Sequence, residues 1–282
     1  MRTRFTIPLR NGSTLLAGER TLVVGVLNVT PDSFSDGGRH FDTSEAIDHA
    51  LKMQGDGADI IEIGGESTRP GAKGLSVEEE LARILPVLTG LGKSLQVPLS
   101  VDTSKSEVAR AALDLGVSII NDVSALRFDP KIADVALGAG AALVFMHMRG
   151  TPEIMQKMEP SPDIFAEIAG DFEAAIAEAE SRGVGRDRII LDPGIGFGKT
   201  QEQNLDILNH LDRFDHFNLA LMVGTSRKSF IGRITGREAD ERAFGTAASV
   251  AVSIARGAHL VRVHDVKEMV EVARVADAII NT

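Results

Sequence analysis

The sequence predicts an α/β protein: a closed (β/α)8 barrel of the TIM type, preceded by a β-hairpin. Eight short apolar runs alternate with amphipathic segments of helical periodicity along the 282 residues. The runs are nearly uninterrupted, as in parallel strands whose two faces are both covered. Eight strand–helix units in about 260 residues fit a closed barrel. A doubly wound open sheet competes, but it usually has fewer strands and carries a nucleotide-binding fingerprint.

The N-terminal segment predicts a hairpin. Apolar runs at 5–9 and 14–16 flank Asn11-Gly12, a pair typical of a β-hairpin turn. We assign residues 1–17 to this hairpin, which we expect to close the bottom of the barrel, and residues 1–282 to a single domain. The barrel strands are expected at Thr21–Leu27, Ala58–Ile63, Pro98–Val101, Ser118–Ile120, Ala141–Met146, Arg188–Leu191, Ala220–Val223 and His259–Val263.

Helical segments separate these runs. A long one follows the seventh strand, from Lys228 to about Ala255, and a break is expected near Gly236 because glycine often ends a helix. Two pairs of residues have the spacing of an N-terminal capping box: Ser76 with Glu79, and Ser104 with Glu107.

Composition excludes several classes of protein. The 30 basic and 40 acidic residues give a net charge of −10, and the 12 Phe are accompanied by no Trp or Tyr, so nucleic-acid binding is disfavoured. The absence of Cys excludes disulfides, thiolate metal sites and a cysteine nucleophile. No apolar run approaches the roughly 20 residues of a membrane span, and the N-terminus lacks the apolar stretch of a signal peptide. We therefore expect a cytoplasmic protein without a membrane partner.

Polar residues follow all eight predicted strands. Helix capping explains some of them, and it is the favoured explanation for Ser104, Asp122 and Asp265. Several strands, however, end in two or three polar residues, which capping does not require. In a barrel all eight ends meet at one rim, where active sites lie. The strand-end residues are Asn28, 64–71, 102–105, 121–122, 147–149, 192–199, 224–228 and 262–265.

Three familiar motifs are absent. The segment 194–200 misses the Walker A spacing by one residue, and its glycines also miss the dinucleotide-binding spacing. It is better explained as a tight glycine loop that lets the backbone approach a ligand. There is no His-Glu-x-x-His zinc motif, and Ser67 and Ser226 lack the Gly-x-Ser-x-Gly context of a hydrolase nucleophile.

The rim residues indicate a class of ligand. Three cationic or titratable side chains follow the last two strands, where barrels often bind phosphate: Lys228, Arg262 and His264. Asp102, Asn121 and Asp192 suit a flat heterocycle with N–H donors, because one carboxylate can accept two such bonds from an amino-lactam edge. The residues alone thus indicate a phosphorylated, nitrogen-rich small molecule and leave the reaction open.

Seven motifs span almost the whole chain: NVTPDSFSDGG (28–38), GGESTRPG (64–71), SVDTSK (100–105), NDV (121–123), DPGIGFGK (192–199), VGTSRKSFIG (223–232) and RVHDV (262–266). In identity and order they resemble the motifs of the bacterial dihydropteroate synthases. The resemblance implies a pterin-binding barrel that joins 4-aminobenzoate to (7,8-dihydropterin-6-yl)methyl diphosphate in folate biosynthesis, with release of diphosphate. It also implies a dissociative substitution assisted by Mg²⁺, a homodimer and inhibition by sulfonamides.

The resemblance further implies roles for individual residues. The pterin ring would be bound by Asp102, Asn121, Asp192 and Lys228, with Met146 and Phe197 as apolar walls. The diphosphate would be bound by Arg262, His264, Thr68 and Asn28, the last through Mg²⁺. The aminobenzoate site would be formed by Phe34, Thr68, Arg69, Pro70 and Ser226. Catalysis would depend on Asp36, as stabiliser of a transient cation, and on Arg69, Lys228, Arg262 and His264.

Three other functions remain open from the sequence. A pterin-dependent methyltransferase would bind a similar ring but would need neither Mg²⁺ nor the Ser-Arg-Lys segment at 226–228. A non-catalytic pterin-binding paralogue should have lost Asn28, Asp36 or Arg69, and all three are present. A Schiff-base aldolase that used Lys228 would form a borohydride-trapped adduct with a carbonyl substrate, and we expect none.

Overall fold

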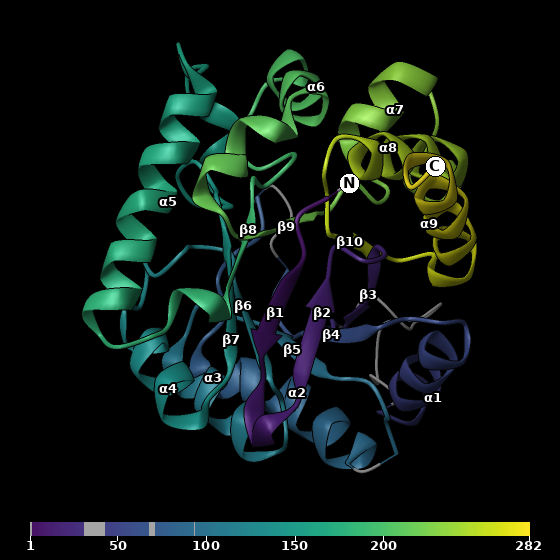
Figure 1. Ribbon diagram of the computed structural model, residues 1–282. Helices are drawn as coiled ribbons and strands as arrows, with labels where there is room; N and C mark the ends of the chain where they lie inside the picture. Colours follow the sequence, from purple (N-terminus) through teal and green to yellow (C-terminus); the bar gives the residue numbers. More distant parts are fainter. Residues whose placement is uncertain (1, 31–42, 68–70, 93) are drawn as a thin grey trace.

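A closed barrel of parallel strands forms the centre of the molecule in a computed structural model, which describes residues 2–30, 43–67, 71–92 and 94–282 (Figure 1). Neighbouring strands follow the order β10-β3-β4-β5-β6-β7-β8-β9. The predicted (β/α)8 fold is confirmed, and each strand begins and ends within two residues of the run that predicted it. The strands are β3 (Leu22–Asn28), β4 (Ile60–Gly64), β5 (Leu99–Asp102), β6 (Ile119–Asp122), β7 (Ala142–Met146), β8 (Ile189–Asp192), β9 (Ala220–Val223) and β10 (Leu260–Val263).

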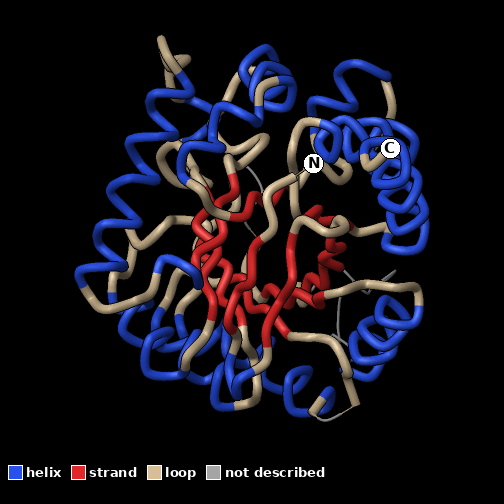
Figure 2. The backbone as a smooth tube through the Cα atoms, viewed as in Figure 1, coloured by secondary structure: helices blue, strands red, loops and turns tan. Residues whose placement is uncertain are grey.

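Helices surround the strands on the outside (Figure 2). The predicted break at Gly236 is confirmed, because this residue takes the left-handed conformation (φ 70°) that ends α7. Among the described residues no helix is both long and apolar enough to cross a membrane. The helices are α1 (Thr43–Gly55), α2 (Val77–Leu91), α3 (Ser106–Asp114), α4 (Lys131–Ala139), α5 (Ile164–Ser181), α6 (Gln201–Asn209), α7 (Ser229–Thr235), α8 (Ala243–Ala255) and α9 (Val266–Ile280).

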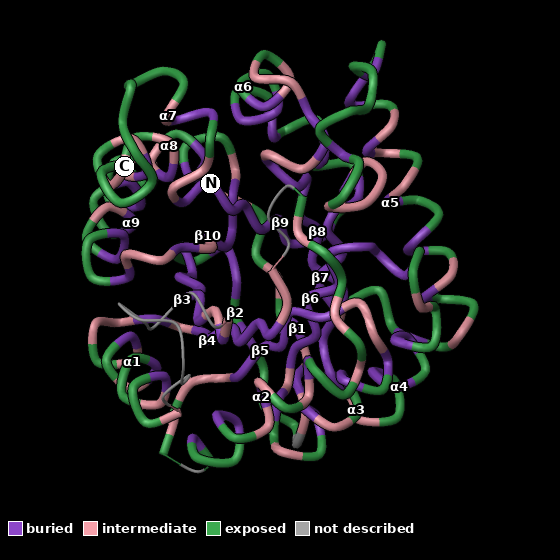
Figure 3. The backbone as a smooth tube through the Cα atoms, turned by 180° about the vertical axis from the view of Figure 1, so that it is seen from behind, coloured by how far each residue is buried: buried purple, intermediate pink, exposed green. Residues whose placement is uncertain are grey.

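Strand β4 shows how the barrel wall faces two ways, since successive side chains point to opposite sides of a sheet. Ile61 and Ile63 belong to the large core between strands and helices. Ile60 belongs to a second apolar core at the bottom of the barrel, and Glu62 follows it on the inner face. The barrel interior is therefore apolar at the bottom and polar above. Figure 3 shows the buried segments gathered at the barrel and the exposed ones on the outer helices.

The N-terminal hairpin closes the bottom of the barrel. Strands β1 (Phe5–Pro8) and β2 (Thr14–Ala17) pair antiparallel and lie across one mouth of the barrel (Figures 1 and 2). Ile7 and Leu15 are buried in the same apolar core as Leu22 and Ile60 of the barrel strands. The connection differs from the tight two-residue turn expected at Asn11-Gly12: it is a longer loop that contains a 3-10 turn, Arg10–Gly12. Ser13 closes this loop by accepting a backbone hydrogen bond from Leu9.

The two predicted capping boxes have different outcomes. The Ser76–Glu79 box is present at the start of α2, with both reciprocal hydrogen bonds. The prediction of a Ser104–Glu107 box is wrong, because α3 begins at Ser106. The N–H of Ser106 donates to Asp129 Oδ2 at 2.8 Å. A carboxylate from the next strand–helix loop thus takes the place of the local serine, which sequence spacing alone could not reveal.

Candidate active site

The carboxyl ends of the barrel strands bring polar side chains from distant parts of the chain into one cup. Asp102 of β5, Asn121 of β6 and Asp192 of β8 are all buried there. Arg262 of β10 forms an ion pair with Asp102 and acts electrostatically on Asp192 and on Lys228. The cup thus contains five of the residues that the resemblance assigned to pterin and diphosphate binding.

Arg262 bridges two buried carboxylates. Its Nε donates to Glu62 Oε1 at 2.5 Å, and its Nη2 donates to Asp102 Oδ2 at 3.0 Å. Burial raises the pKa of Asp102 to about 8; the charge of Glu62 adds to this effect, and Arg262 opposes it. One guanidinium therefore serves two carboxylates from neighbouring strands.

Glu62 also contacts Asn121, which sequence analysis assigned to the pterin ring. Asn121 Nδ2 donates to Glu62 Oε2 at 3.0 Å, whereas Asn121 Oδ1 is buried and has no hydrogen-bond partner among the described residues. Sequence analysis missed Glu62, although a signal was present: it is an acidic residue inside the apolar run Ile60–Gly64 of a strand covered on both faces.

Asp192 is held by the loop that follows β8. Gly194 N donates to Asp192 Oδ1 at 2.8 Å. Burial raises the pKa of Asp192, and Lys228 is the largest opposing influence. Lys228 Nζ donates to the Ile195 carbonyl of the same loop and lies 4.7 Å from the centre of the Phe197 ring, within cation–π range. Burial lowers the pKa of Lys228 to about 8. The loop after β8 therefore brings the Asp192 carboxylate, the Lys228 ammonium group and the Phe197 ring together.

A buried lysine fastens this loop from within. Lys199 Nζ donates to the carbonyls of Gly194 at 2.8 Å, His147 at 3.2 Å and Phe197 at 3.2 Å. Burial lowers its pKa well below the usual value for lysine, and the charge of Lys228 acts in the same direction. Sequence analysis gave Lys199 no role. The structure shows that it orders the backbone that positions Asp192 and Phe197.

The two predicted apolar walls of the ring site lie in one small cluster. Met146 is buried with Val123, Met148 and Met155 at the ends of β6 and β7, and Phe197 packs against this group. Methionine side chains adapt their shape and make favourable contacts with aromatic rings. The cluster therefore places polarisable side chains beside Lys228, whose Nζ lies over the Phe197 ring.

Ser226 and His264 contact each other across the ends of β9 and β10. Ser226 Oγ accepts a hydrogen bond from His264 N at 3.1 Å and lies 3.0 Å from His264 Nδ1. Arg227, which stands between Ser226 and Lys228, has a positive φ of 59°. Its Nε donates to Asp265 at 3.1 Å. Asp265 does precede α9, as expected of a cap, but its side chain makes no capping hydrogen bond. The ion pair instead holds the Ser-Arg-Lys segment in an unusual conformation.

The residues near the end of β3 fit a Mg²⁺ ion held mainly by a substrate. Mg²⁺ takes oxygen ligands, often one or two from protein and the rest from phosphates and water. A methyl group built on Gly64 would lie 3.8 Å from both Asn28 Oδ1 and Asp102 Oδ2, so the two oxygens border the same small region beside Gly64. Among the described residues no group of three His, Asp or Glu side chains could hold a metal without such a substrate.

Five of the predicted site residues lie outside the described residues: Phe34, Asp36, Thr68, Arg69 and Pro70. In the sequence they follow β3 and β4. The predicted residues that the structure does describe all lie at the carboxyl ends of barrel strands or in the loops that directly follow them.

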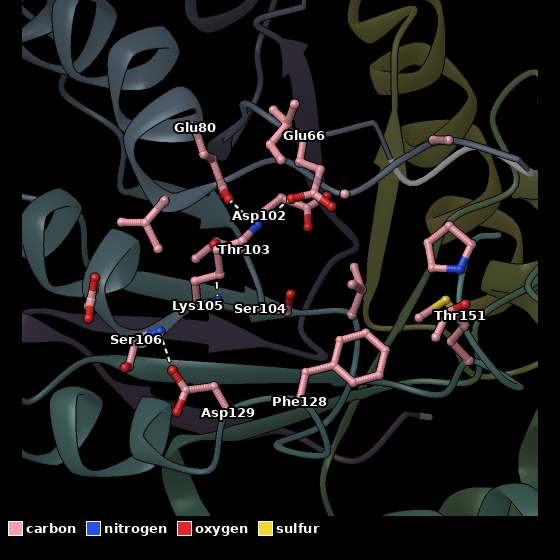
Figure 4. Close-up of a pocket in the computed structure, with 18 of the residues that line it drawn as sticks. Glu66, Glu80, Asp102, Thr103, Ser104, Lys105, Ser106, Phe128, Asp129 and Thr151 are labelled. Atoms are coloured by element: carbon pink, nitrogen blue, oxygen red, sulfur yellow. Dashed lines mark hydrogen bonds and ion pairs between the residues drawn. The ribbon is translucent and has the colours of Figure 1, made fainter.

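A cavity of about 540 Å³ borders the cup between the loops that follow β4 to β7 (Figure 4). Lys105 lies at its wall between two carboxylates: its Nζ donates to Glu80 Oε2 at 2.6 Å and also pairs with Glu66. Asp102 lines both the cavity and the cup. The Lys105 cluster therefore ties the described part of the loop after β4 to α2 and to the loop after β5.

The barrel, its polar cup and the adjoining apolar cluster are the features expected of a barrel enzyme that binds a small ring compound. The sequence model of the pterin binding enzymes matches residues 24–264, so the chain belongs to this family of pterin-binding barrels. More particularly, it belongs to the dihydropteroate synthases, a family of transferases in folate biosynthesis. The dihydropteroate synthase of Synechocystis sp. is 46% identical over 277 residues, which cover 98% of this chain and 96% of the relative.

Solved structures agree with this assignment. The Yersinia pestis dihydropteroate synthase in complex with a sulfonamide drug matches with a TM-score of 0.90 at 40% identity and covers 98% of each chain. The Xanthomonas albilineans dihydropteroate synthase with 4-aminobenzoic acid matches with a TM-score of 0.89 at 42% identity, covering 97% of this chain and 98% of that chain.

Proposed function

We propose that this chain condenses (7,8-dihydropterin-6-yl)methyl diphosphate with 4-aminobenzoate and yields 7,8-dihydropteroate and diphosphate. The observation that carries the proposal is the cup in which Asp192, Asp102 and Asn121 face Lys228 and Arg262. Such a cup matches a ring with N–H donors that carries an anionic group. Membership of the dihydropteroate synthases and the 4-aminobenzoic acid bound by the Xanthomonas relative support the choice of substrates.

The ring would bind through its amino-lactam edge. Asp192 keeps one oxygen engaged with Gly194 N, and the carboxylate retains lone pairs for two N–H donors of the ring. Asn121 Oδ1 offers an acceptor that lacks a partner among the described residues. Met146 and Phe197 would contact the faces of the ring. Loss of the Asp192 acceptor would leave ring donors unpaired in a buried site, which is costly.

The diphosphate would bind above the ring, near the ends of β3 and β10. Arg262 would supply positive charge and N–H donors there, and His264 would supply an imidazole nitrogen. Asn28 would hold a Mg²⁺ ion, which when bound neutralises charge on the diphosphate oxygens. Because the net charge of the chain is −10, only such a local cluster of cations can attract a polyanion.

We propose that the substitution is dissociative. The bond between the methylene carbon and the diphosphate oxygen breaks first, and its electron pair leaves with the diphosphate. The remaining cation is stabilised by the electron-rich pterin and, in our proposal, by Asp36. The aminobenzoate nitrogen then forms the new C–N bond and loses a proton, which leaves with diphosphate or water. Arg69 would help to position the aminobenzoate, and exclusion of water from the site would keep water from trapping the cation.

The activity is tested with the purified chain, both substrates and Mg²⁺. We expect equal amounts of dihydropteroate and diphosphate, and loss of turnover in excess chelator. Asp192→Asn should lower kcat/KM at least about 100-fold, because an amide cannot accept from two N–H groups as the carboxylate does. Ser100→Ala is a matched control, since Ser100 lies at the same barrel level as Glu62 and its buried hydroxyl makes no hydrogen bond among the described residues. Absence of product from the wild-type chain would refute the proposed activity.

The dissociative step has its own test. The substrate is labelled with oxygen-18 at the oxygen that joins the methylene carbon to phosphorus. Without aminobenzoate, reversible cleavage of the carbon–oxygen bond moves this label into non-bridging positions of the same phosphate. We expect this scrambling in the presence of Mg²⁺. Turnover with aminobenzoate but no scrambling would show that the amine attacks before the bond breaks.

We also propose that the chain forms a homodimer through the last two helices. Phe244 of α8 and Val275 and Ile279 of α9 are large apolar side chains with 92%, 62% and 68% exposure. Exposed apolar side chains that gather on one face are typical of protein interfaces. Light scattering should give twice the chain mass of 30.1 kDa, and Val275→Asp combined with Ile279→Asp should give the single mass. A wild-type chain that stays monomeric at micromolar concentration would refute this interface.

A further inference from the structure

Glu62 is a buried charged residue at the centre of the barrel to which the proposed mechanism gives no role. Its side chain is only 1% exposed, and both of its oxygens are used. Oε1 accepts from Arg262 Nε at 2.5 Å, and Oε2 accepts from Asn121 Nδ2 at 3.0 Å. The carboxylate thus joins a residue of β6 to a residue of β10 across the barrel. Burying a carboxylate is costly, so these two contacts must offset its loss of hydration.

The contact with Asn121 fixes the orientation of an amide. An asparagine side chain can present either its oxygen or its NH2 group in a given direction, and the hydrogen-bond network decides which. A carboxylate paired with Arg262 only accepts hydrogen bonds, so it turns the NH2 group of Asn121 toward itself. Asn121 Oδ1 then points away from Glu62 and finds no partner among the described residues. A buried acceptor in this position calls for a donor from a ligand.

The contact with Arg262 fixes the position of a cation inside the cup. Because Arg262 Nη2 also donates to Asp102, the guanidinium is fixed between two carboxylates on neighbouring strands. Charged hydrogen bonds of this kind are stronger than neutral ones and define geometry closely. The same contact reduces the positive charge that Arg262 can offer to an anion, since Glu62 neutralises part of it.

We propose that Glu62 is a positioning residue: it presents the oxygen of Asn121 to the ligand ring, so that the site selects rings with an N–H donor at that position, and it fixes Arg262 against the ring pocket. The inference rests on the proposed function, because the ring is taken to be a pterin. It makes two distinct predictions. Loss of Glu62 should weaken binding of the ring, and it should not weaken binding of diphosphate, because a carboxylate that competes for Arg262 is removed.

The experiment uses the full chain and two separate probes. The first is 6-hydroxymethylpterin, which carries the ring without phosphate and whose fluorescence is free of protein emission at long wavelength because the chain has no Trp or Tyr. The second is inorganic pyrophosphate with Mg²⁺, measured by calorimetry. For Glu62→Gln we expect about 10- to 100-fold weaker ring binding, the range for loss of a hydrogen bond to a charged group. Pyrophosphate binding should be equal to or tighter than that of the wild type.

A double variant that exchanges the two side-chain types distinguishes a role of Glu62 in orienting Asn121 from a general loss of structure. In Glu62→Gln combined with Asn121→Asp, the carboxylate and the amide exchange places while the total charge and size are conserved. The carboxylate introduced at position 121 accepts with both oxygens, so an acceptor faces the ring again. Ring binding should then return to within about fivefold of the wild type because one hydrogen bond is restored. Ser100→Ala, on the neighbouring strand, controls for the loss of a buried polar group without these contacts.

Each outcome decides the matter. If Glu62→Gln binds the ring within twofold of the wild type, or if the double variant gives no recovery, Glu62 does not orient Asn121. If ring and pyrophosphate binding fall together, with a matching loss of thermal stability, Glu62 is merely structural. If the wild-type chain itself fails to bind the pterin, the proposed function is at fault rather than the role of Glu62.

Discussion

Gly194→Ala is the substitution whose effect the structure defines most sharply. Gly194 has a φ of +67°, and a Cβ atom built on it would lie 1.9 Å from the carbonyl oxygen of His147. Since real Cβ atoms stay at least 3.0 Å from such atoms, the backbone must move by 3.0 − 1.9 = 1.1 Å or more. Left-handed backbone costs a non-glycine residue about 1–2 kcal/mol, and overpacking adds about 1–3 kcal/mol. We therefore expect a loss of about 2–5 kcal/mol in the free energy of unfolding.

The same displacement should also impair the site. Gly194 N donates to Asp192 Oδ1, and the next residue supplies the carbonyl that Lys228 Nζ contacts. A shift of about 1 Å in a positioning element can cost about 100-fold in activity, and we expect a loss of that order in affinity for 6-hydroxymethylpterin. Fluorescence titration gives the affinity, and denaturant unfolding followed by circular dichroism gives the stability.

Gly236→Ala is the matched control. Gly236 has nearly the same φ of +70°, but a Cβ atom there would meet nothing within 4 Å, and the residue ends α7 rather than a site loop. Its substitution should cost about 1–2 kcal/mol of stability and leave ring affinity unchanged. The reasoning is refuted if Gly194→Ala binds the ring within threefold of the wild type and is no less stable than Gly236→Ala.

Three further predictions concern a proton, a loop and the closure of the barrel. Burial raises the pKa of Asp102 to about 8, and ring N–H donors favour its ionised form. Ring binding should therefore release a fraction of a proton at pH 7 and none well above pH 9. Calorimetric enthalpies that are equal in phosphate and Tris buffers would disprove this. Lys199→Met removes the donor for three buried carbonyls and should lower the unfolding free energy by about 1–3 kcal/mol while weakening ring binding; an unchanged denaturant midpoint and affinity would contradict it. Asp277 is buried, accepts from Thr21 N at 2.6 Å and pairs with Arg2. Asp277→Ala should therefore lower the free energy of unfolding by about 3–5 kcal/mol, and a loss below about 1 kcal/mol on denaturant unfolding would argue against the pairing.

The barrel itself was predictable because its signal is local. Parallel strands with both faces covered need uninterrupted apolar runs, and those runs can be counted without knowing any contact between them. The polar ends of the strands were equally visible, since the loops at one rim of a barrel must all come after strands. Asp102, Asn121, Asp192 and Arg262 were found in this way, together with the motifs that the dihydropteroate synthases share.

Capping at the start of α3 was not predictable, although the sequence offered a candidate. Ser104 and Glu107 have the right spacing, but Asp129, from the next loop, accepts the first N–H of the helix. The hydrogen bond is the same in energy whether its acceptor is near or far in sequence, so spacing rules find only the near ones. Lys199 escaped notice for a similar reason, because its partners are backbone carbonyls, which have no sequence signature.

The sequence by itself determined where the eight barrel strands lie and which polar residues stand at their carboxyl ends, because both signals are local to each strand. Only the tertiary structure decided which of these side chains meet. Glu62 and Arg262 are separated by 200 residues, and their contact exists because closure of the sheet sets β4 and β10 on either side of β3 at a particular stagger. That stagger depends on the packing of all eight strands at once, so the pairing that orients Asn121 and holds Arg262 is a property of the closed barrel and of no single segment.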